Sequence, residues 1–326
     1  MIINIAQVNC YLLMEDGICY NSKKGVIMAK LCLGTVQFGM QYGIYNKYGQ
    51  PSMEDCFEMF DIALDSGINK IDTAAAYGIA EELIGKYVHR RGKSNDLEII
   101  SKLRPNVLDV ESGTPQQIIR AQAVRSLRRM NIELLDGYLL HTPEYIYNSD
   151  ILEGLQNIKK EGLVKNIGVS IYDIKEGDAA INTGIVDYIQ LPYSVFDQRG
   201  MIDEFFVKAK QSNITIYCRS AFLQGLILMN ENEIPMHLID AKKYVTIFNE
   251  LVQKYDVNAI DTLIHFVYDN EYIDYLVFGV DTKEQLKYDI EAVKKKSMPV
   301  ELMTEIEDKL KNIGKSIIIP SLWKKN

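Results

Sequence analysis

The sequence predicts an α/β fold, a (β/α)8 or TIM barrel with an N-terminal β-rich extension. Short apolar runs rich in Ile, Val, Leu and Tyr alternate with longer segments of helical period. Eight such strand–helix units follow one another in the chain of 326 residues, and eight units over about 250 residues are typical of this barrel. The strand runs show little apolar–polar alternation, as expected when both sheet faces are covered.

The predicted elements follow in chain order. The strand candidates are all short apolar runs: Leu31–Gln37, Ile68–Thr73, Leu97–Lys102, Leu135–His141, Val164–Ser170, Val186–Leu191, Ile214–Ser220 and Tyr275–Val280. The helical candidates between and after them cover residues 53–66, 79–90, 116–130, 150–161, 173–182, 201–211, 241–254 with 258–269, and 283–293. A doubly wound sheet is the alternative, but the stretch LGTVQFGMQYG after the first strand lacks the G-x-G-x-x-G pattern that such a sheet normally has there.

Two segments lie outside the eight units. Residues 1–30 hold two β-rich runs, Ile2–Met14 and Gly17–Met28. They predict either a hairpin that caps the barrel floor or an appended strand pair without a catalytic part. Residues 31–326 contain no Pro/Ser-rich linker, so we expect a single domain there. The tail after residue 299 includes Trp323 and is expected either over the barrel mouth or along its side.

Composition narrows the class of protein. The chain is 47% hydrophobic and 25% charged with a net charge of −8, so it has no basic footprint for nucleic acid. The five cysteines are scattered and contain no C-x-x-C pair, which predicts free thiols in place of a disulfide framework or zinc site. No stretch reads as a signal peptide or a membrane span. We therefore expect a cytoplasmic protein with no metal, nucleic-acid or membrane partner.

The strand candidates end on polar residues, and in a (β/α)8 barrel these ends meet at the face that holds the active site. Asp72, Lys102 and His141 close three consecutive strands, and Tyr77 follows Asp72 by five residues. Any one of them could be an ordinary loop-edge residue. An acid, a phenol, an amine and an imidazole that converge from neighbouring strands instead predict a proton-transfer group.

The four side-chain types suit one task. A phenol with a pKa near ~10 is a poor acid at neutral pH, and a nearby ammonium is expected to lower that pKa. A carboxylate keeps the ammonium charged in a partly dry pocket. A neutral imidazole can orient a carbonyl by a hydrogen bond. The group can therefore deliver a proton to a carbonyl oxygen while hydride reaches the carbon, provided that a hydride donor is present.

Six stretches carry a resemblance to a known family. They are IDTAAAYGIAEELIG, EIISK, LDGYLLH, NIGVS, YIQLPYS and RSAFLQG, and together the chain from about residue 31 to 295 resembles the aldo-keto reductase superfamily. The resemblance implies that Tyr77 is the general acid/base and Lys102 its partner. It also implies that Asp72 pairs with the lysine and that His141 orients the carbonyl.

The resemblance further implies a nicotinamide cofactor, NADP(H) or NAD(H), bound in extended form across the barrel mouth. The family's usual Asn after the serine of NIGVS is Ile171 here, and an arginine replaces the aromatic residue that many members stack on the nicotinamide. NADP-preferring members usually place a basic residue near the adenosine, where this chain has an aspartate, which argues for NAD(H). The cofactor contacts implied by the resemblance are Thr35, Ser170, Gln190, Arg219, Ser220, Leu223, Gln224, Gly279, Asp281, Thr282, Lys283 and Gln285.

The function expected from these features is that of an NAD(P)-dependent oxidoreductase that interconverts a carbonyl compound and an alcohol. Loops near Gln41–Gln50 and Phe222–Pro235 are expected to form the substrate pocket. The Gln41–Gln50 loop is rich in Tyr, Asn and Gly, which suits a polar, sugar-like carbonyl. Two alternatives stay open. One is a non-catalytic nicotinamide-binding regulatory subunit, like the potassium-channel β-subunits that share the fold. The other is a barrel lyase that uses Lys102 as a Schiff-base amine.

Overall fold

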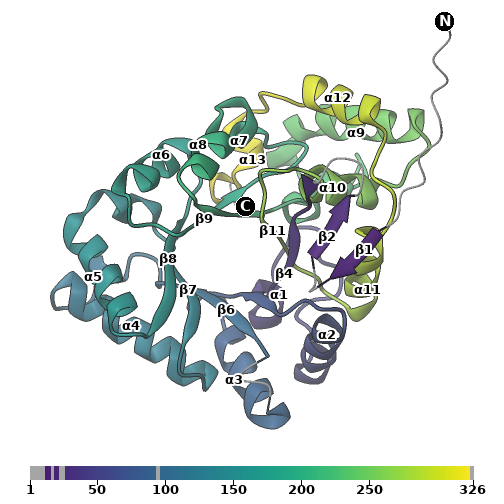
Figure 1. Cartoon of the computed structure of the whole chain (residues 1–326). Helices are drawn as coiled ribbons and strands as arrows, with labels where there is room; N and C mark the ends of the chain where they lie inside the picture. Colours follow the sequence, from purple (N-terminus) through teal and green to yellow (C-terminus); the bar gives the residue numbers. More distant parts are fainter. Residues whose placement is uncertain (1–11, 16–17, 22–25, 93–95, 324–326) are drawn as a thin grey trace, which may run out of the picture.

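Eight parallel strands close into a barrel in the order β10-β11-β4-β5-β6-β7-β8-β9 (Figure 1). The computed structural model describes residues 12–15, 18–21, 26–92 and 96–323. The barrel and the helices around it confirm the predicted (β/α)8 class. The barrel strands are β4 (Lys30–Gly34), β5 (Lys70–Asp72), β6 (Glu98–Lys102), β7 (Leu135–Leu140), β8 (Val164–Ser170), β9 (Tyr188–Pro192), β10 (Thr215–Arg219) and β11 (Tyr275–Phe278).

Helices surround the barrel on its outer side (Figure 1). The α-helices are α1 (Val36–Gly39), α2 (Met53–Asp65), α3 (Ala80–Arg91), α4 (Pro115–Met130), α5 (Ser149–Lys160), α6 (Ile174–Thr183), α7 (Arg199–Ile202), α8 (Phe205–Gln211), α9 (Lys242–Lys254), α10 (Ala259–Tyr268), α11 (Lys283–Ala292), α12 (Val300–Lys309) and α13 (Lys315–Ile318). Short 3-10 helices are η1 (Val107–Asp109), η2 (Pro143–Tyr147), η3 (Leu223–Leu228), η4 (Met236–Ala241) and η5 (Pro320–Leu322).

The helix boundaries follow local chemistry. At the start of α4 the Thr114 side chain accepts a hydrogen bond from the Gln117 backbone, and the Gln117 side chain reaches back to the Thr114 backbone. This capping box satisfies two N–H groups that have no partner within the helix. The helix ends at Asn131, whose left-handed backbone (φ 54°) turns the chain away. Capping boxes of the same kind begin α6 and α11.

Two predicted boundaries were wrong. The first strand ends at Gly34 and not at Gln37, because the Thr35 amide donates to the Asp72 carbonyl at 2.9 Å and the chain then turns into α1. The helix predicted over 201–211 is broken into α7 and α8. Glu204 lies between them with a positive φ of 54°, which a continuous α-helix does not allow.

The strand register brings the polar strand ends to one level. Gly34 pairs with Asp72, and Asp72 pairs with Ile100, two residues before Lys102. On the other side of the barrel Ser170 pairs with Gln190. Side chains that are far apart in the sequence therefore point into the same end of the barrel.

The barrel interior has three layers. At the floor, the Lys70 ammonium lies 2.8 Å from Asp136 and 2.5 Å from Glu98. The middle layer is apolar and aromatic and excludes water from the centre; it consists of Cys32, Ile100, Leu139, Tyr188, Tyr217 and Val277. The upper layer holds the Asp72–Lys102 pair. The middle layer thus separates two buried ion pairs.

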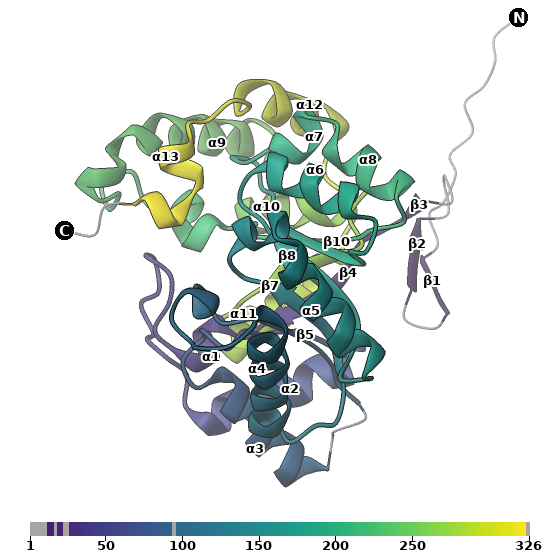
Figure 2. The ribbon, with the colours of Figure 1, turned by 90° about the vertical axis from the view of Figure 1, so that its left-hand side faces the viewer.

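The described parts of the N-terminal extension and of the C-terminal tail lie at opposite faces of the barrel (Figure 2). The described part of the extension forms a three-stranded antiparallel sheet of β1 (Leu12–Glu15), β2 (Ile18–Asn21) and β3 (Val26–Ile27). Figure 2 shows this sheet beside the end of the barrel at which the strands begin. The rest of the predicted runs Ile2–Met14 and Gly17–Met28 falls partly on residues 1–11, 16–17 and 22–25, which lie outside the described residues.

The C-terminal tail lies on the other face, beside the barrel mouth (Figure 2). Lys315 forms an ion pair with Asp173, which follows β8, and α13 packs against η4. The Trp323 indole donates to the Ile317 carbonyl at 2.9 Å. No described helix has the length and apolar character that crossing a membrane requires.

The floor ion pair gives a testable prediction. Asp136 and Lys70 are 7% and 5% exposed, so Asp136→Asn leaves a buried ammonium with Glu98 as its remaining carboxylate. We expect the free energy of unfolding to fall by about 3 kcal/mol, because breaking a buried pair costs far more than breaking an exposed one. Urea denaturation measures the change. Asp308→Asn, which breaks the exposed pair with Lys311, is the control and should cost less than about 1 kcal/mol; equal losses would contradict the prediction.

Candidate active site

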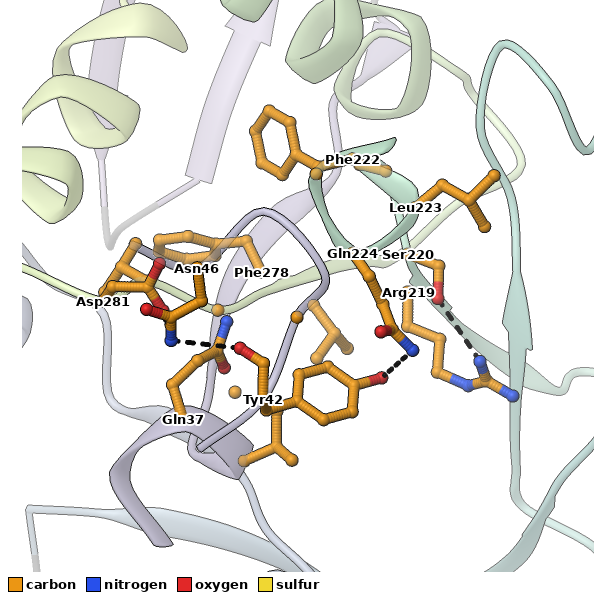
Figure 3. Close-up of a pocket in the computed structure, with 18 of the residues that line it drawn as sticks. Gln37, Tyr42, Asn46, Arg219, Ser220, Phe222, Leu223, Gln224, Phe278 and Asp281 are labelled. Atoms are coloured by element: carbon orange, nitrogen blue, oxygen red, sulfur yellow. Dashed lines mark hydrogen bonds between the residues drawn. The ribbon is translucent and has the colours of Figure 1, made fainter. Parts of the chain in front are cut away.

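A cavity of about 690 Å³ opens at the C-terminal ends of the barrel strands. Loops after β4, β5, β8, β10 and β11 form its wall, and Figure 3 shows the part between the loops after β4, β10 and β11. Most residues predicted from the sequence line this cavity: Thr35, Asp72, Tyr77, His141, Ser170, Arg219, Ser220, Leu223, Gln224, Gly279, Asp281 and Gln285. Lys102, Gln190, Thr282 and Lys283 are not among the lining residues.

A buried ion pair lies at the base of the cavity. The Lys102 ammonium donates to both carboxylate oxygens of Asp72, at 2.7 and 2.8 Å, and to the Thr73 carbonyl at 2.9 Å. Lys102 is fully buried, and burial lowers its pKa, an effect that Asp72 opposes by its charge and its hydrogen bonds. The ammonium also reaches the Tyr77 hydroxyl at 3.3 Å. The structure therefore joins three of the four predicted proton-transfer residues directly.

The position of Tyr77 is set by a close contact between two backbone segments. Gly78 has a positive φ of 52°, and the amide of Ile79 donates to the Gly39 carbonyl at 3.1 Å. A Cβ atom on Gly39 would lie 1.7 Å from the Tyr77 carbonyl, and one on Gly78 would lie 2.2 Å from the Gly39 carbonyl. Only glycine fits at both positions, since any other side chain would push the segments apart.

The Tyr77 pKa differs from the sequence-based expectation. Burial raises the pKa of the Tyr77 hydroxyl far above its ordinary value, and the charge of Asp72 raises it further, while Arg219 lowers it. The net lowering of this pKa that was expected beside an ammonium is therefore not found. The physical reason is that desolvation dominates and that the negative charge of Asp72 also raises the pKa of Tyr77. Tyr77 accordingly stays protonated at neutral pH.

His141 faces the same phenol. Its ring meets the Tyr77 ring edge-on, with centroids 5.8 Å apart and an interplanar angle of 86°. Burial, together with the charges of Lys102 and Arg219, lowers the pKa of His141 to about 3. Its Nδ1 atom is buried and has no hydrogen-bond partner among the described residues. At neutral pH the imidazole is uncharged and can act as a hydrogen-bond donor through one ring nitrogen.

Gln190 supports the ion pair from below. Its Nε2 atom donates to Asp72 Oδ1 at 2.7 Å, and its Oε1 atom accepts from the Ser170 hydroxyl at 3.2 Å. Gln190 is fully buried, whereas Ser170 reaches the cavity wall. The two residues that the sequence assigns to a cofactor carboxamide are thus linked to each other, and only Ser170 lines the cavity.

Arg219 lies at the end of β10 and lines the cavity. Its guanidinium donates to the Ile171 carbonyl at 3.1 Å and to the Ser220 hydroxyl at 3.3 Å, and it covers the Tyr172 ring at 4.5 Å. These contacts hold the planar group between the loops after β8 and β10 (Figure 3). Sequence reasoning did not anticipate Tyr172, because no motif reports which ring lies beneath the arginine.

The loop after Arg219 has an unusual backbone. Ser220, Leu223 and Gln224 have positive φ angles of 67°, 46° and 56°, and Gly225 follows at 85°. Non-glycine residues rarely adopt this region, and clusters of such residues occur at ligand-binding loops. Successive backbone N–H groups in such turns can form an anion-binding concavity.

The far end of the cavity is acidic. Asp281 Oδ1 accepts a hydrogen bond from Asn46 at 3.0 Å, and burial raises the pKa of Asp281. Thr282 caps α11 by accepting from the Gln285 amide, so its hydroxyl serves the helix and not the cavity. The Lys283 ammonium points to Glu58 at 2.7 Å. The only basic residue predicted at this end is therefore paired elsewhere.

Several lining residues escaped the sequence reasoning. Gln37 lies within the predicted first strand, and its buried Oε1 atom has no partner among the described residues. Asp289 is 6% exposed and lines the cavity; burial and the charge of Asp261 raise its pKa to about 7. Asp289 follows Gln285 by four residues in α11, and that helical spacing was a usable signal. Tyr42 and Asn46 belong to the Gln41–Gln50 loop that the sequence did single out.

Asn46 fixes that loop over the cavity. Its Nδ2 atom donates to the Tyr42 and Gly49 carbonyls, both at 3.1 Å, and to Asp281. The Gln224 amide donates to the Tyr42 hydroxyl at 3.1 Å, which joins the loop to the segment after β10 (Figure 3). Among the described residues no group of three His, Cys, Asp or Glu side chains is placed to hold a metal ion.

Comparisons with known proteins agree with this geometry. Aldo-keto reductase YhdN of Bacillus subtilis is 24% identical over 288 residues, which cover 81% of this chain and 84% of that protein. The NADH-specific methylglyoxal reductase of Escherichia coli is 23% identical over 222 residues, 62% of this chain and 66% of the relative. The holo form of an aldo-keto reductase from Bacillus halodurans has the same fold, with a TM-score of 0.71 at 19% identity over 92% of this chain and 99% of that one.

A family model also matches most of the chain. The model described as the aldo/keto reductase family matches residues 30–311, which include the whole barrel and every residue of the candidate site. Members of this family are oxidoreductases that act on carbonyl compounds with NAD(P)H. With the barrel, the Asp72–Lys102–Tyr77 contacts and His141 in place, the chain belongs to the aldo/keto reductase family.

Proposed function

We propose that this protein reduces an aldehyde or a ketone to the alcohol with NAD(P)H, and that Tyr77 is its general acid/base. The observation that carries the proposal is the Tyr77 hydroxyl, which faces the cavity, lies 3.3 Å from the Lys102 ammonium and sits against the His141 ring. A phenol held in this way can give its proton to an oxygen bound beside it. Because the pKa of Tyr77 is raised, its hydroxyl carries the proton at neutral pH, as a proton donor must.

Each residue then has one task. A nicotinamide held beside Ser170 would be the source of hydride for the carbonyl carbon. Tyr77 supplies the proton to the carbonyl oxygen, and neutral His141 donates a hydrogen bond that orients the same oxygen. Lys102 keeps a positive charge next to the phenol oxygen, where negative charge develops as the proton leaves. Asp72 and Gln190 act as positioning residues, since Asp72 binds Lys102 and Gln190 in turn binds Asp72.

The cavity fits an extended nicotinamide dinucleotide. Its volume of about 690 Å³ is in the range of ligand sites, and it runs from the Tyr77 end to the start of α11. Ser170 would hold the nicotinamide end, and the loop from Ser220 to Gly225 would hold the phosphates. Gln37 has a buried oxygen without a partner, and it packs so closely on Gly279 that a Cβ there would lie 2.4 Å from it. A glycine cradle and an orphaned polar atom are features of a site that receives a ligand.

NAD(H) is the cofactor that the acidic end favours. Asp281 and Asp289 both line this end, and Lys283 is turned to Glu58. A 2′-phosphate would place two further negative charges beside buried carboxyl groups, at a cost that NADH does not incur. In the loop over the cavity, Tyr42, Asn46 and Tyr48 supply hydroxyl and amide groups for a polar substrate.

The Schiff-base alternative has little support in the geometry. Lys102 Nζ is fully buried, donates to three acceptors in Asp72 and Thr73, and does not line the cavity. A carbonyl compound would have to displace Asp72 to reach it. The other alternative, a non-catalytic regulatory subunit, would bind the nicotinamide cofactor but would not reduce any carbonyl substrate. A measurement of turnover therefore distinguishes it from the proposed enzyme.

Replacing the proton donor tests the proposal directly. Tyr77→Phe keeps the ring and removes the hydroxyl, so we expect kcat for aldehyde reduction to fall by about 10²- to 10⁴-fold, the usual worth of a general acid. NADH oxidation with a set of aldehydes measures it, and NADH fluorescence should show unchanged cofactor binding. Tyr147→Phe, at a 63% exposed residue outside the cavity, is the control. Full activity in Tyr77→Phe, or NADH binding by wild type with no turnover of any aldehyde, would refute the proposal.

The protonation state of His141 gives a pH prediction. With a pKa of about 3, His141 is neutral at every pH above that value and charged only below it. The reductive kcat at saturating NADH and aldehyde should therefore show no step from His141 between about pH 5 and 8. Saturation removes any effect of Asp289 on cofactor affinity. A limb with an apparent pKa of 6 to 7 that disappears in His141→Gln would contradict a neutral imidazole.

The cofactor preference is tested at Asp281. Asp281→Asn removes the charge and keeps an acceptor for Asn46. We expect wild type to bind NADH more tightly than NADPH, and the substitution to lower the Kd of NADPH about tenfold, or about 1.4 kcal/mol, with less than threefold change for NADH. Fluorescence titration with both cofactors measures this. NADPH binding by wild type as tight as NADH binding would overturn the preference.

A further inference from the structure

Among the described residues, Arg219 is a cation without a counterion. The groups that it contacts there, the Ile171 carbonyl, the Ser220 hydroxyl and the Tyr172 ring, are all neutral. Among the described residues it has no ion pair, whereas other half-buried arginines do: Arg199 forms two hydrogen bonds to Asp197, and Arg129 binds Glu81. A guanidinium has five N–H donors, and two hydrogen bonds are formed within the described residues. The remaining donors and the whole charge are available to a ligand.

The charge of Arg219 acts on the proton-transfer group. It lowers the pKa of Tyr77, of Lys102 and of His141, so the guanidinium is within electrostatic range of all three. Among the described residues, no carboxylate at this end of the cavity forms an ion pair with Arg219. The one carboxylate of the group, Asp72, is already bonded to Lys102 and Gln190. The catalytic end of the cavity therefore carries a net positive charge, opposite in sign to its far end.

A second donor lies beside this charge. The Tyr42 hydroxyl accepts from the Gln224 amide at 3.1 Å, which leaves its own O–H free to donate. Burial raises the pKa of Tyr42 to about 12, and Arg219 lowers it, so the hydroxyl is protonated at neutral pH and close to the guanidinium. Tyr42 and Arg219 both line the cavity together with Tyr77 (Figure 3). A guanidinium and a hydroxyl donor that line the same cavity can together recognise a carboxylate or a phosphate.

We propose that Arg219 is a specificity-determining residue, which with Tyr42 binds an anionic group of the substrate, so that the substrate is an aldehyde or ketone bearing a carboxylate or a phosphate. This inference rests on the proposed reductase activity. It narrows the substrate class from any polar carbonyl compound to an anionic one. A cofactor phosphate offers the same chemistry, and the experiment separates the two sources.

The test compares charged and neutral aldehydes of similar size. Glyoxylate, succinic semialdehyde and 4-carboxybenzaldehyde are each paired with a neutral partner: acetaldehyde, butanal and 4-methylbenzaldehyde. We expect wild type to show at least a tenfold higher kcat/KM for the charged member of one or more pairs. Arg219→Gln should lower the ratio of kcat/KM for the charged member to kcat/KM for its neutral partner by about 10- to 100-fold, as loss of a charge-assisted hydrogen bond predicts. Tyr42→Phe should cause a smaller loss of the same selectivity, and Arg219→Lys should retain part of it.

Cofactor binding and ligand binding separate the possible outcomes. If Arg219→Gln weakens NADH binding and lowers kcat/KM equally for both members of a pair, the anion is the cofactor's phosphate and the inference is overturned. A wild-type preference for the neutral members also overturns it. If no aldehyde is reduced, the proposed activity fails, and calorimetry with butyrate and butyramide still tests the anion site on its own. Butyrate should bind only where Arg219 is present; equal binding to Arg219→Gln would refute the site. Lys311→Gln controls for net charge.

Discussion

The structure depends on one buried contact, the pairing of Lys102 with Asp72. An unpaired ammonium at this depth would cost far more than a domain can lose, so every neighbouring element is arranged to satisfy it. The register of β4, β5 and β6 brings the two side chains to one level. The Thr73 carbonyl accepts a third hydrogen bond from the Lys102 ammonium. From across the barrel, the Gln190 side chain donates a hydrogen bond to Asp72 Oδ1. As a result, the Lys102 ammonium is held at a fixed position beside the Tyr77 hydroxyl.

Beneath this pair, the apolar middle layer has a second effect. It keeps the Asp72–Lys102 pair apart from the Lys70–Asp136 pair at the floor, so each ammonium has its own carboxylate. Without that separation, water and alternative pairings could reach the upper layer from below. The electrostatics of the site are therefore set by the packing of Cys32, Leu139 and Tyr217 as much as by the charged residues.

Much of this could be predicted from the sequence, and the missing parts have physical causes. Asp72, Lys102 and His141 could be predicted because the carboxyl ends of all the parallel strands lie at one face of the barrel. Residues that end neighbouring strands are therefore close together in space. The sign of the Tyr77 pKa shift was not found, because desolvation depends on burial that no sequence pattern measures. Gln190 was assigned to the cofactor, and the structure adds a hydrogen bond from it to Asp72 that the sequence did not predict. The neutral surroundings of Arg219 come from Ile171 and Tyr172, which follow β8, and only the folded chain brings them against the end of β10.

The contact between Gly39 and Gly78 has a consequence for how this protein tolerates sequence change. Both backbones are so close that a single methyl group at either position would meet the opposite chain, yet neither glycine belongs to the barrel strands. A substitution there displaces the segment that bears Tyr77 while the eight strands and their core stay intact. We therefore expect substitution at either position to give a folded barrel without reductase activity. In related barrels, the presence of both glycines would then indicate that the enzyme activity is still under selection.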